Sequence, residues 1–567
     1  MSEQPSPSTG KVVSSCDVVV VGAGIGGLYA LHRLRSLGLD VQVFEAGDGV
    51  GGTWYWNRYP GARCDVESLF YSYSFSAELE QEWEWTERYP TQREILSYLN
   101  HVADRFELRR DIRLETRVTA AVYDEAARRW SVTTDRGDQV MAQFVVMATG
   151  CLSTWQIPAF PGVDSFQGER YHTGNWPHDP VDFAGKRVGF IGTGSTGIQA
   201  IPQIAKTARQ LTVFQRTPNY AIPARNAPLR PGDQREVKAR YREIRERMRT
   251  SPSGLPFAVA ERAVLEEPPD LYLEALEEAW QAGGPPFLMM YRDVAVAEDA
   301  NAIVADFVRS KIRETVRDPA TAELLCPIDH PIGSKRICIE IEYFETYNRD
   351  NVELVDVRHS PVEEITPTGL RTSERTYELD VLVFATGFDA MTGTLLRIDI
   401  RGRGGVPLRE RWADGPRTYL GLQVAGFPNL FTITGPGSPS VLSNMVVSIE
   451  QHVDWIADCI TDLRAANLDT IEALPEAETI WVEHVNEVGA MTLYPKANSW
   501  YLGANIPGKP RIFMPYVGGV GVYRQYCDEV REAGYQGFVR SSPAGPADAP
   551  SPRAFATVTR YSKASAT

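Results

Sequence analysis

Two stretches of the chain share one pattern: an apolar run, a glycine-rich turn and a helix with one apolar face. In the first stretch, the run 18–21 precedes the turn 22–27, and leucines then recur every three residues from Leu28 to Leu37. In the second stretch, the run 188–191 precedes the turn 192–197, and isoleucines recur every three residues from Ile198 to Ile204. This order predicts a buried strand that leads into a helix packed on a sheet. The chain therefore contains two predicted strand–helix–strand units of the same kind.

Both turns fit the spacing G-x-G-x-x-G, in which glycines let the backbone approach a pyrophosphate at a helix N-terminus. The predicted contact residues are Gly22, Gly24 and Gly27 in the first turn, and Gly192, Thr193, Gly194, Ser195 and Gly197 in the second. The residue that ends the next strand is Glu45 in the first unit and Arg216 in the second. An acid accepts a hydrogen bond from a ribose 2′-hydroxyl, whereas an arginine accommodates a 2′-phosphate. We therefore expect FAD in the first unit and NADPH in the second.

The rest of the chain is organised around these units. Further strands are predicted near 118–122, 130–134 and 144–148, and Ala-Thr-Gly triplets at 148–150 and 385–387 bracket the second unit. We expect an α/β fold with two Rossmann-like dinucleotide-binding domains. The predicted FAD-binding domain comprises residues 16–150 and 390–540, and the NADP-binding domain, residues 151–389, is inserted in it.

A charged, helical insertion is predicted at about 224–330, from segments such as 235–249 and 270–281. We expect its charges to form a solvated helix face and the insertion to cover part of a cleft. Residues 1–15 and 541–567 are rich in Ser, Pro and Ala and are predicted to be flexible tails.

Composition narrows the function further. The chain has 58 Lys and Arg against 73 Asp and Glu, a net charge of −15, which argues against nucleic-acid or anionic-membrane binding. It has no apolar run of membrane-spanning length and no secretory signal, so we expect a cytoplasmic protein. Its seven cysteines include no C-x-x-C pair, which disfavours a disulfide scaffold, a metal site and a dithiol reductase. No obligate protein partner is evident.

Two segments outside the glycine turns carry candidate chemistry. Residues 51–65 are dense in glycine, aromatics and cations, and end at Asp65, a possible partner for a catalytic cation. Just before the second unit stands F-x-G-x-x-x-H-x-x-x-W-P, formed by Phe166, Gly168, His172, Trp176 and Pro177. We call these five residues the 166–177 motif and place it on the link between the domains.

The 166–177 motif, between two G-x-G-x-x-G turns, resembles that of type I Baeyer–Villiger monooxygenases, which are class B flavoprotein monooxygenases. Residues 51–65, 335–336, 435–438 and 499–505 extend the match, and the Arg63-Cys64-Asp65 form is similar to that of phenylacetone and steroid monooxygenases. The resemblance implies that NADPH and O2 are used to insert one oxygen atom beside a ketone carbonyl through a C4a-peroxyflavin. The product would be an ester or lactone, and the substrate a bulky, cyclic or steroid-like ketone.

The resemblance also implies roles for individual residues. Arg336 would be the catalytic cation, held by Asp65, and Trp500 would close over the nicotinamide. Arg216, Thr217 and Lys335 would bind the 2′-phosphate, and His172 would couple the domains. Further cofactor contacts would be Thr53, Trp54, Tyr71, Val118 and Gln199, and the substrate pocket would include Ser440, Val441 and Met445. Cys151 departs from the phenylacetone enzyme, which has glutamine there, and this leaves the substrate preference open.

Two alternatives remain at this stage. One is a flavin-dependent monooxygenase that acts on nitrogen or sulfur. The other is a dinucleotide-binding redox sensor without oxygenation. The Trp-Pro ending of the 166–177 motif, with Asp65 and Arg336, favours the ketone reaction over both.

Overall fold

The first glycine-turn unit forms the centre of an eight-stranded sheet in the computed structural model, which describes residues 13–547. Strand β1 (Val13–Val21) leads through the turn into α1 (Ile25–Ser36), and the chain returns in β2 (Val41–Phe44). β1 lies between β2 and β6 (Gln139–Met147) and is parallel to both. The sheet order is β17-β4-β5-β6-β1-β2-β3, with β18 beside β6; the further strands are β3 (Ile112–Arg113), β4 (Val118–Asp124), β5 (Arg129–Thr134), β17 (Asp399–Arg401) and β18 (Leu430–Thr432).

The second glycine-turn unit forms the centre of a five-stranded parallel sheet. β8 (Arg187–Ile191) leads into α5 (Ser195–Ala205) and then β9 (Gln210–Gln215). The sheet order is β12-β9-β8-β16-β7, completed by β12 (Val352–Asp356), β16 (Val381–Phe384) and β7 (Glu169–His172). Phe190 and Ile191 point to opposite faces of β8 and are 0% and 8% exposed, as the continuous apolar run predicts for a parallel strand covered on both faces.

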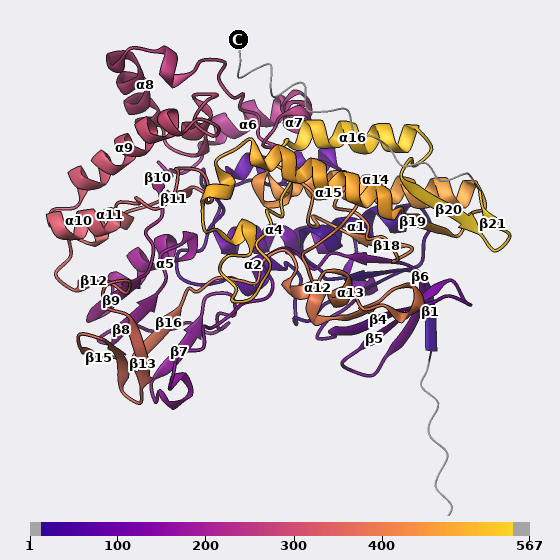
Figure 1. Ribbon diagram of the computed structural model, residues 1–567, viewed down its shortest axis with the longest axis horizontal. Coiled ribbons are helices and arrows are strands. Elements are labelled where there is room, and N and C mark those ends of the chain that lie inside the picture. Colours follow the sequence, from indigo (N-terminus) through magenta and orange to yellow (C-terminus); the bar gives the residue numbers. More distant parts are fainter. Residues whose placement is uncertain (1–12, 548–567) are drawn as a thin grey trace, which may run out of the picture.

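The two sheets lie side by side, the first at the lower right of Figure 1 and the second at the lower left. Strands β17 and β18 follow the second unit in the chain, yet they pair with β4 and β6 of the first sheet. This pairing agrees with a second dinucleotide-binding unit inserted in the first. We retain the residue boundaries of the two domains as a proposal.

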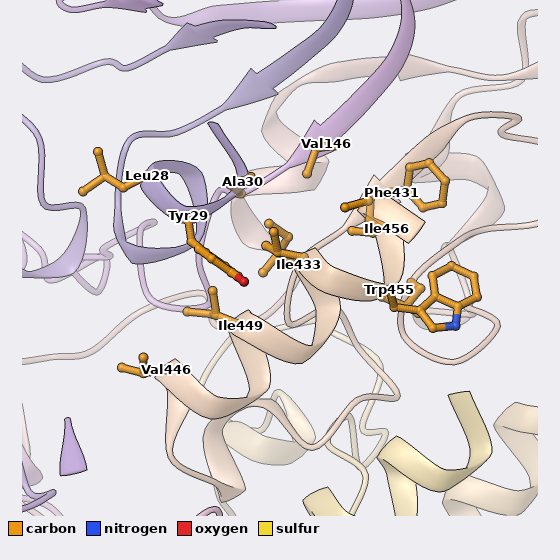
Figure 2. Close-up of a cluster of buried hydrophobic side chains, with 14 of the residues drawn as sticks. Leu28, Tyr29, Ala30, Val146, Phe431, Ile433, Val446, Ile449, Trp455 and Ile456 are labelled. Carbon is orange, nitrogen blue, oxygen red and sulfur yellow. The ribbon is translucent and has the colours of Figure 1, made fainter. Parts of the chain in front are cut away.

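The core of the first unit forms where α1 meets α14 (Met445–Ala465), with β6 and β18 beside them (Figure 2). Leu28 of α1, Val146 of β6 and Phe431 of β18 are each at most 1% exposed. Burial of a large apolar side chain stabilises a fold by about 1.5–3 kcal/mol. The leucine repeat of α1 points into this core, except that Leu37 caps the helix and is 36% exposed.

The helical insertion comprises α6 (Pro231–Ala239), α7 (Tyr241–Thr250), α8 (Pro269–Ala282), α9 (Glu298–Thr315) and α10 (Pro319–Leu325). The predicted helix at 235–249 is broken at Arg240, whose φ of −108° and ψ of 9° are not helical. The expectation of a wholly solvated charged face is wrong for Arg245. That side chain is buried and forms an ion pair with Glu80 at 2.7 Å. One cation of α7 therefore attaches the insertion to the segment around Glu80, in the first part of the chain.

The ordered part of the chain extends into both predicted tails. Residues 13–15 belong to β1 and pair with β6. Residues 541–542 belong to β20 (Phe538–Ser542), which pairs with β19 (Thr470–Ala473) and β21 (Gly545–Pro546). Ladder hydrogen bonds order these residues despite their composition. The rest of the predicted tails, residues 1–12 and 548–567, lies outside the described residues.

The remaining α-helices and strands complete the fold. The helices are α2 (Thr53–Trp56), α3 (Ala77–Glu82), α4 (Gln92–Arg105), α11 (Tyr343–Thr346), α12 (Gly393–Arg397), α13 (Leu408–Arg411), α15 (Pro475–Ala490) and α16 (Val520–Glu532). The strands are β10 (Ala221–Pro223), β11 (Cys338–Glu340), β13 (Val362–Thr366), β14 (Gly369–Thr372) and β15 (Thr376–Glu378). Within residues 13–547, none of the helices combines the length and the apolar character needed to cross a bilayer.

Candidate active site

One cavity of about 1370 Å³ is lined by both glycine turns. Pockets for single small molecules usually measure about 300–1,000 Å³, so this cavity has room for more than one ligand. Its wall contains the carboxyl ends of β1 and β8, where parallel sheets place their ligands. It also contains residues 148–156 and 385–388, including both Ala-Thr-Gly triplets.

The first glycine turn is a tight fit that only glycine satisfies. Gly22 has φ +104°, and a Cβ added there would lie 2.6 Å from the carbonyl oxygen of Ala148. A Cβ on Gly27 would lie 1.8 Å from the carbonyl oxygen of Gly22. Gly22 and Gly24 line the cavity, whereas Gly27 lies behind it in α1. The turn therefore leaves bare backbone facing the cavity at the start of a helix, which suits a phosphate.

Glu45 lines the same part of the cavity and is 6% exposed. Its two carboxylate oxygens accept hydrogen bonds from the backbone N–H groups of Ala23 and Gly47, each at 2.8 Å. Burial raises the pKa of this carboxyl. A carboxylate has about four acceptor positions, so Glu45 supports the glycine turn and keeps capacity for a ribose hydroxyl.

The second turn repeats this geometry. Gly192 has φ +114°, and added Cβ atoms on Gly192 and Gly197 would lie 2.4 Å from the carbonyl oxygens of Ala385 and Gly192. Gly192, Thr193, Gly194 and Ser195 line the cavity, and Gly197 lies behind it in α5. The Oγ of Ser195 lies 3.0 Å from the Sγ of Cys338, and Thr193 donates a hydrogen bond to the carbonyl of Thr217.

Two cations follow the second turn on the cavity wall. Arg216 and Lys335 both line the cavity, together with Thr217. Burial lowers the pKa of Lys335; Asp329 opposes this shift, and the positive charge of Arg216 adds to it. Two cations that repel each other beside a glycine turn form a site suited to a phosphate dianion.

Gln199 of α5 connects the two predicted domains. Its Oε1 accepts a hydrogen bond from the Tyr59 hydroxyl at 2.9 Å, and its Nε2 donates to the carbonyl of Arg63 at 3.1 Å. All three residues line the cavity. The 51–65 segment of the first unit is thereby attached to the first helix of the second, a role for Gln199 that the sequence did not indicate.

Arg336 and Asp65 form a two-point ion pair on the cavity wall. Nε and Nη2 of Arg336 donate to the two carboxylate oxygens of Asp65 at 2.5 and 2.8 Å, and Nη1 donates to the carbonyl of Val441 at 2.5 Å. Burial alone would raise the pKa of Asp65, but the guanidinium lowers it below its usual value. Burial likewise opposes protonation of Arg336, but Asp65 raises its pKa well above the usual value. Both groups therefore stay charged near neutral pH.

The four residues predicted to contact the flavin all reach the cavity. Thr53, Trp54, Tyr71 and Val118 all line the cavity. The indole N–H of Trp54 donates to the Tyr71 hydroxyl at 3.3 Å, and the two rings meet edge to face with centroids 5.9 Å apart. This rigid aromatic pair can form the side of a pocket for a planar ring.

The structure divides the predicted substrate residues. Val441 and Met445 line the cavity, as does Trp500, which begins a short helix that ends before Gly503 at φ +70°. Ser440 was predicted to lie in the pocket but is not part of the wall; it is fully buried, with its Oγ 3.1 Å from the Sγ of Cys151. Cys151 itself lines the cavity.

The 166–177 motif lies behind the cavity wall; none of its five residues lines the cavity. His172 ends β7, accepts the N–H of Gly174 at 3.0 Å, and stacks on Trp155 with ring centroids 5.0 Å apart. Burial lowers the pKa of His172 to about 4, so the ring is neutral at physiological pH. Its contacts with Trp155, and with Thr386 at 3.4 Å, connect it to two residues that do line the cavity.

The helical insertion, which is expected to cover part of a cleft, does not line this cavity. Of the described residues 224–330, none contributes to the cavity wall. Other parts of the wall include Thr434 and Asn498, which no sequence motif indicated, and Asn505, which belongs to the matched segment 499–505.

Comparisons with known proteins place the chain among flavin-dependent oxygenases. A family model for flavin-binding monooxygenase-like proteins matches residues 15–228. A Baeyer–Villiger monooxygenase of Pseudooceanicola batsensis is 44% identical over 94% of this chain and 98% of its own length. The solved structure of an oxidised steroid monooxygenase bound to NADP is 57% identical, covers 93% of this chain and 100% of its own, and has a TM-score of 0.89. A phenazine N-monooxygenase of Lysobacter antibioticus is 42% identical over 93% of this chain and 97% of its own length.

Proposed function

Because the chain belongs to the Baeyer–Villiger monooxygenase family, we propose that its cavity is the site of ketone oxygenation. The enzyme uses FAD and NADPH. Its second substrate is O2, and one oxygen atom enters beside the ketone carbonyl to give an ester or lactone. The observation that carries the proposal is the Arg336–Asp65 pair on a cavity shared by two dinucleotide-binding turns.

The residues fit both cofactors. The first turn and Glu45 provide the phosphate and ribose sites of FAD, and Trp54 and Tyr71 provide an aromatic wall. The second turn, Arg216 and Lys335 provide the site of the 2′-phosphorylated nucleotide. Bound FAD, reduced by NADPH, supplies the activation of O2.

The protein's own contribution to the reaction is electrostatic. Arg336 presents a fixed positive charge where negative charge develops on the carbonyl oxygen of the ketone. Asp65 sets the orientation of the guanidinium through two hydrogen bonds, and the carbonyl of Val441 fixes the third nitrogen. Preorganised groups of this kind contribute roughly 10²–10³ in rate. Closure of the segment around Trp500 would exclude water from the site.

We propose a bulky or cyclic ketone as the substrate. The cavity must hold two cofactors and still leave space bounded by Cys151, Val441 and Met445. Relatives with 41–44% identity act, by their names, on ketones as different as acetone and cyclohexanone, so the wall residues set the preference. We further propose a cytoplasmic enzyme without an obligate protein partner.

A second candidate function is oxygenation of a nitrogen heterocycle, because the chain also resembles a phenazine N-monooxygenase along nearly its full length. Both reactions would use the same flavin and nucleotide sites. They differ in the protonation state that the oxygen donor needs. An oxygen donor that attacks a carbonyl must be anionic, whereas one that is attacked by a nitrogen lone pair must be protonated. The cation of Arg336 favours the anionic form, and therefore the ketone.

The test is a substrate panel with ¹⁸O2. Ketones of increasing ring size, a steroid ketone, an aliphatic methyl ketone and an aromatic N-heterocycle are each incubated with NADPH, and products are identified by mass. We expect esters or lactones that carry one ¹⁸O atom, and loss of these products in Arg336→Met. NADPH consumption without an oxygenated ketone, or products from the heterocycle alone, would overturn the assignment.

A further inference from the structure

A fully buried histidine outside the cavity holds a residue of the cavity wall in an unusual backbone conformation. His452 of α14 is 0% exposed, and its Nδ1 accepts the backbone N–H of Thr434 at 2.8 Å. Thr434 lines the cavity and has φ +55°. The left-handed region is costly for a non-glycine residue, above all for a β-branched one. Such strain persists only where surrounding contacts enforce it.

The hydrogen bond fixes the state of the imidazole. Because Nδ1 accepts, the ring is neutral and carries its proton on Nε2. Burial, with a smaller contribution from the cation of Arg524, lowers the pKa of His452 to about 3, so this acceptor persists at physiological pH. Nε2 has no hydrogen-bond partner, and the ring packs against Tyr523 with centroids 5.4 Å apart. The interaction with Thr434 is thus the one polar contact that the ring makes among the described residues.

Thr434 connects His452 to the catalytic arginine through buried contacts. Its Oγ1 and carbonyl oxygen lie 3.4 and 3.5 Å from the Sγ of Cys151. That sulfur lies 3.1 Å from the Oγ of Ser440, a second left-handed residue with φ +42°. Ser440 directly precedes Val441, whose carbonyl accepts Nη1 of Arg336 at 2.5 Å. The Cys151 thiol therefore contacts both left-handed residues, Thr434 and Ser440. Ser440 is next to Val441, whose carbonyl orients the Arg336 guanidinium.

We propose that His452 is a positioning residue: it holds Thr434 left-handed and thereby sets the cavity wall that orients Arg336. This inference rests on the proposed function for its kinetic consequence, but its structural part stands alone. If His452 is replaced by a side chain that cannot accept a hydrogen bond, the backbone N–H of Thr434 loses its partner. The backbone at Thr434 then relaxes from the left-handed region toward negative φ. The Cys151–Ser440 contacts and the Val441 carbonyl then shift, and Arg336 is misaligned.

The test compares variants that differ in one acceptor. His452→Leu removes the acceptor, whereas His452→Asn places an amide oxygen near the position of Nδ1. In the FAD-bound enzyme we expect His452→Leu to lower kcat for ester formation about tenfold and to raise the fraction of NADPH consumed without product. His452→Asn should stay within about twofold of the parent enzyme. If His452→Leu does not fold, His452→Gln replaces it, because its longer side chain places the oxygen away from Nδ1.

A double-mutant cycle separates positioning from simple packing. Glycine adopts φ +55° without strain, so Thr434→Gly should remove the need for His452. We expect the effect of His452→Leu to fall below about twofold in the Thr434→Gly background. Hydrogen exchange of the peptide around residue 434, read by mass spectrometry, should accelerate in His452→Leu and not in His452→Asn.

Three results would overturn the proposal: equal losses in the Leu and Asn variants, a full His452→Leu effect in the Thr434→Gly background, or unchanged exchange around residue 434. Failure of the proposed function is recognised differently, because then the parent enzyme itself gives no ester. The exchange measurement and the visible spectrum of bound FAD still test the positioning in that case.

Discussion

The Asp65 carboxylate is the perturbation that tests the catalytic geometry most directly. Asp65→Asn keeps the shape of the side chain, but it removes the negative charge and replaces one acceptor with an NH2 donor that faces the guanidinium. Arg336 then loses one of the hydrogen bonds measured at 2.5 and 2.8 Å. A hydrogen bond to a charged group contributes about 1.5–3 kcal/mol, so we expect a loss of about 2 kcal/mol in the unfolding free energy. If the guanidinium turns away from the cavity, kcat for oxygenation should fall by roughly 10².

The assay separates these two effects. Flavin reduction by NADPH under anaerobic conditions should be nearly unchanged, whereas ester formation should be lost and NADPH consumption should become uncoupled from product. Asp380→Asn is the control, because Asp380 accepts two hydrogen bonds from the Arg187 guanidinium at 3.2 and 2.8 Å and neither residue lines the cavity. It should lose stability without loss of turnover. Full ester formation by Asp65→Asn, or an equal kinetic loss in Asp380→Asn, would refute the reasoning.

Three further changes test other parts of the structure. Arg216→Ala should raise KM for NADPH by about tenfold and leave KM for NADH unchanged, because only NADPH carries the 2′-phosphate; equal effects in steady-state assays would contradict the predicted site. Gly27→Ala places a Cβ 1.8 Å from the carbonyl oxygen of Gly22. The protein should therefore lose more than about 3 kcal/mol of stability or fail to retain FAD. A normal Tm with full flavin content would show that the turn tolerates a side chain. Burial raises the pKa of Glu340 from 4.5 to about 7; the unfolded chain therefore binds fewer protons between these values, and stability falls as pH rises from 4.5 to 7. Glu340→Gln should abolish this fall and stabilise the enzyme above pH 7 by up to about 3 kcal/mol in denaturant titrations, while an unchanged pH profile would assign the dependence to other groups.

Local sequence was sufficient for the two dinucleotide turns. Gly22 and Gly192 have positive φ, and a Cβ on Gly27 or Gly197 would collide with the carbonyl oxygen of Gly22 or Gly192, so these conditions are set within each turn. The carbonyls of Ala148 and Ala385, which close on Gly22 and Gly192, come from the ends of strands distant in the chain. The apolar faces of α1 and α5 follow from a three-residue period, and Leu28 and Ile201 are buried as that period predicts. Resemblance to a family added the pairing of Asp65 with Arg336, which are 271 positions apart.

Residue types and periods did not determine which side chains face the cavity. Ser440 was predicted to belong to the substrate pocket; its side chain is buried against Cys151 beside the wall, while Thr434 drew no prediction and forms part of the wall. His172 lies one layer behind the wall, and Arg245 of a charged helix is buried against Glu80. Each outcome depends on contacts between segments distant in the chain, whose energies depend on distance and packing in three dimensions. The sequence by itself specified the nucleotide-binding turns and the helix faces, because backbone sterics and periodicity are local. Only the tertiary structure decided which other side chains line the cavity between the two turns.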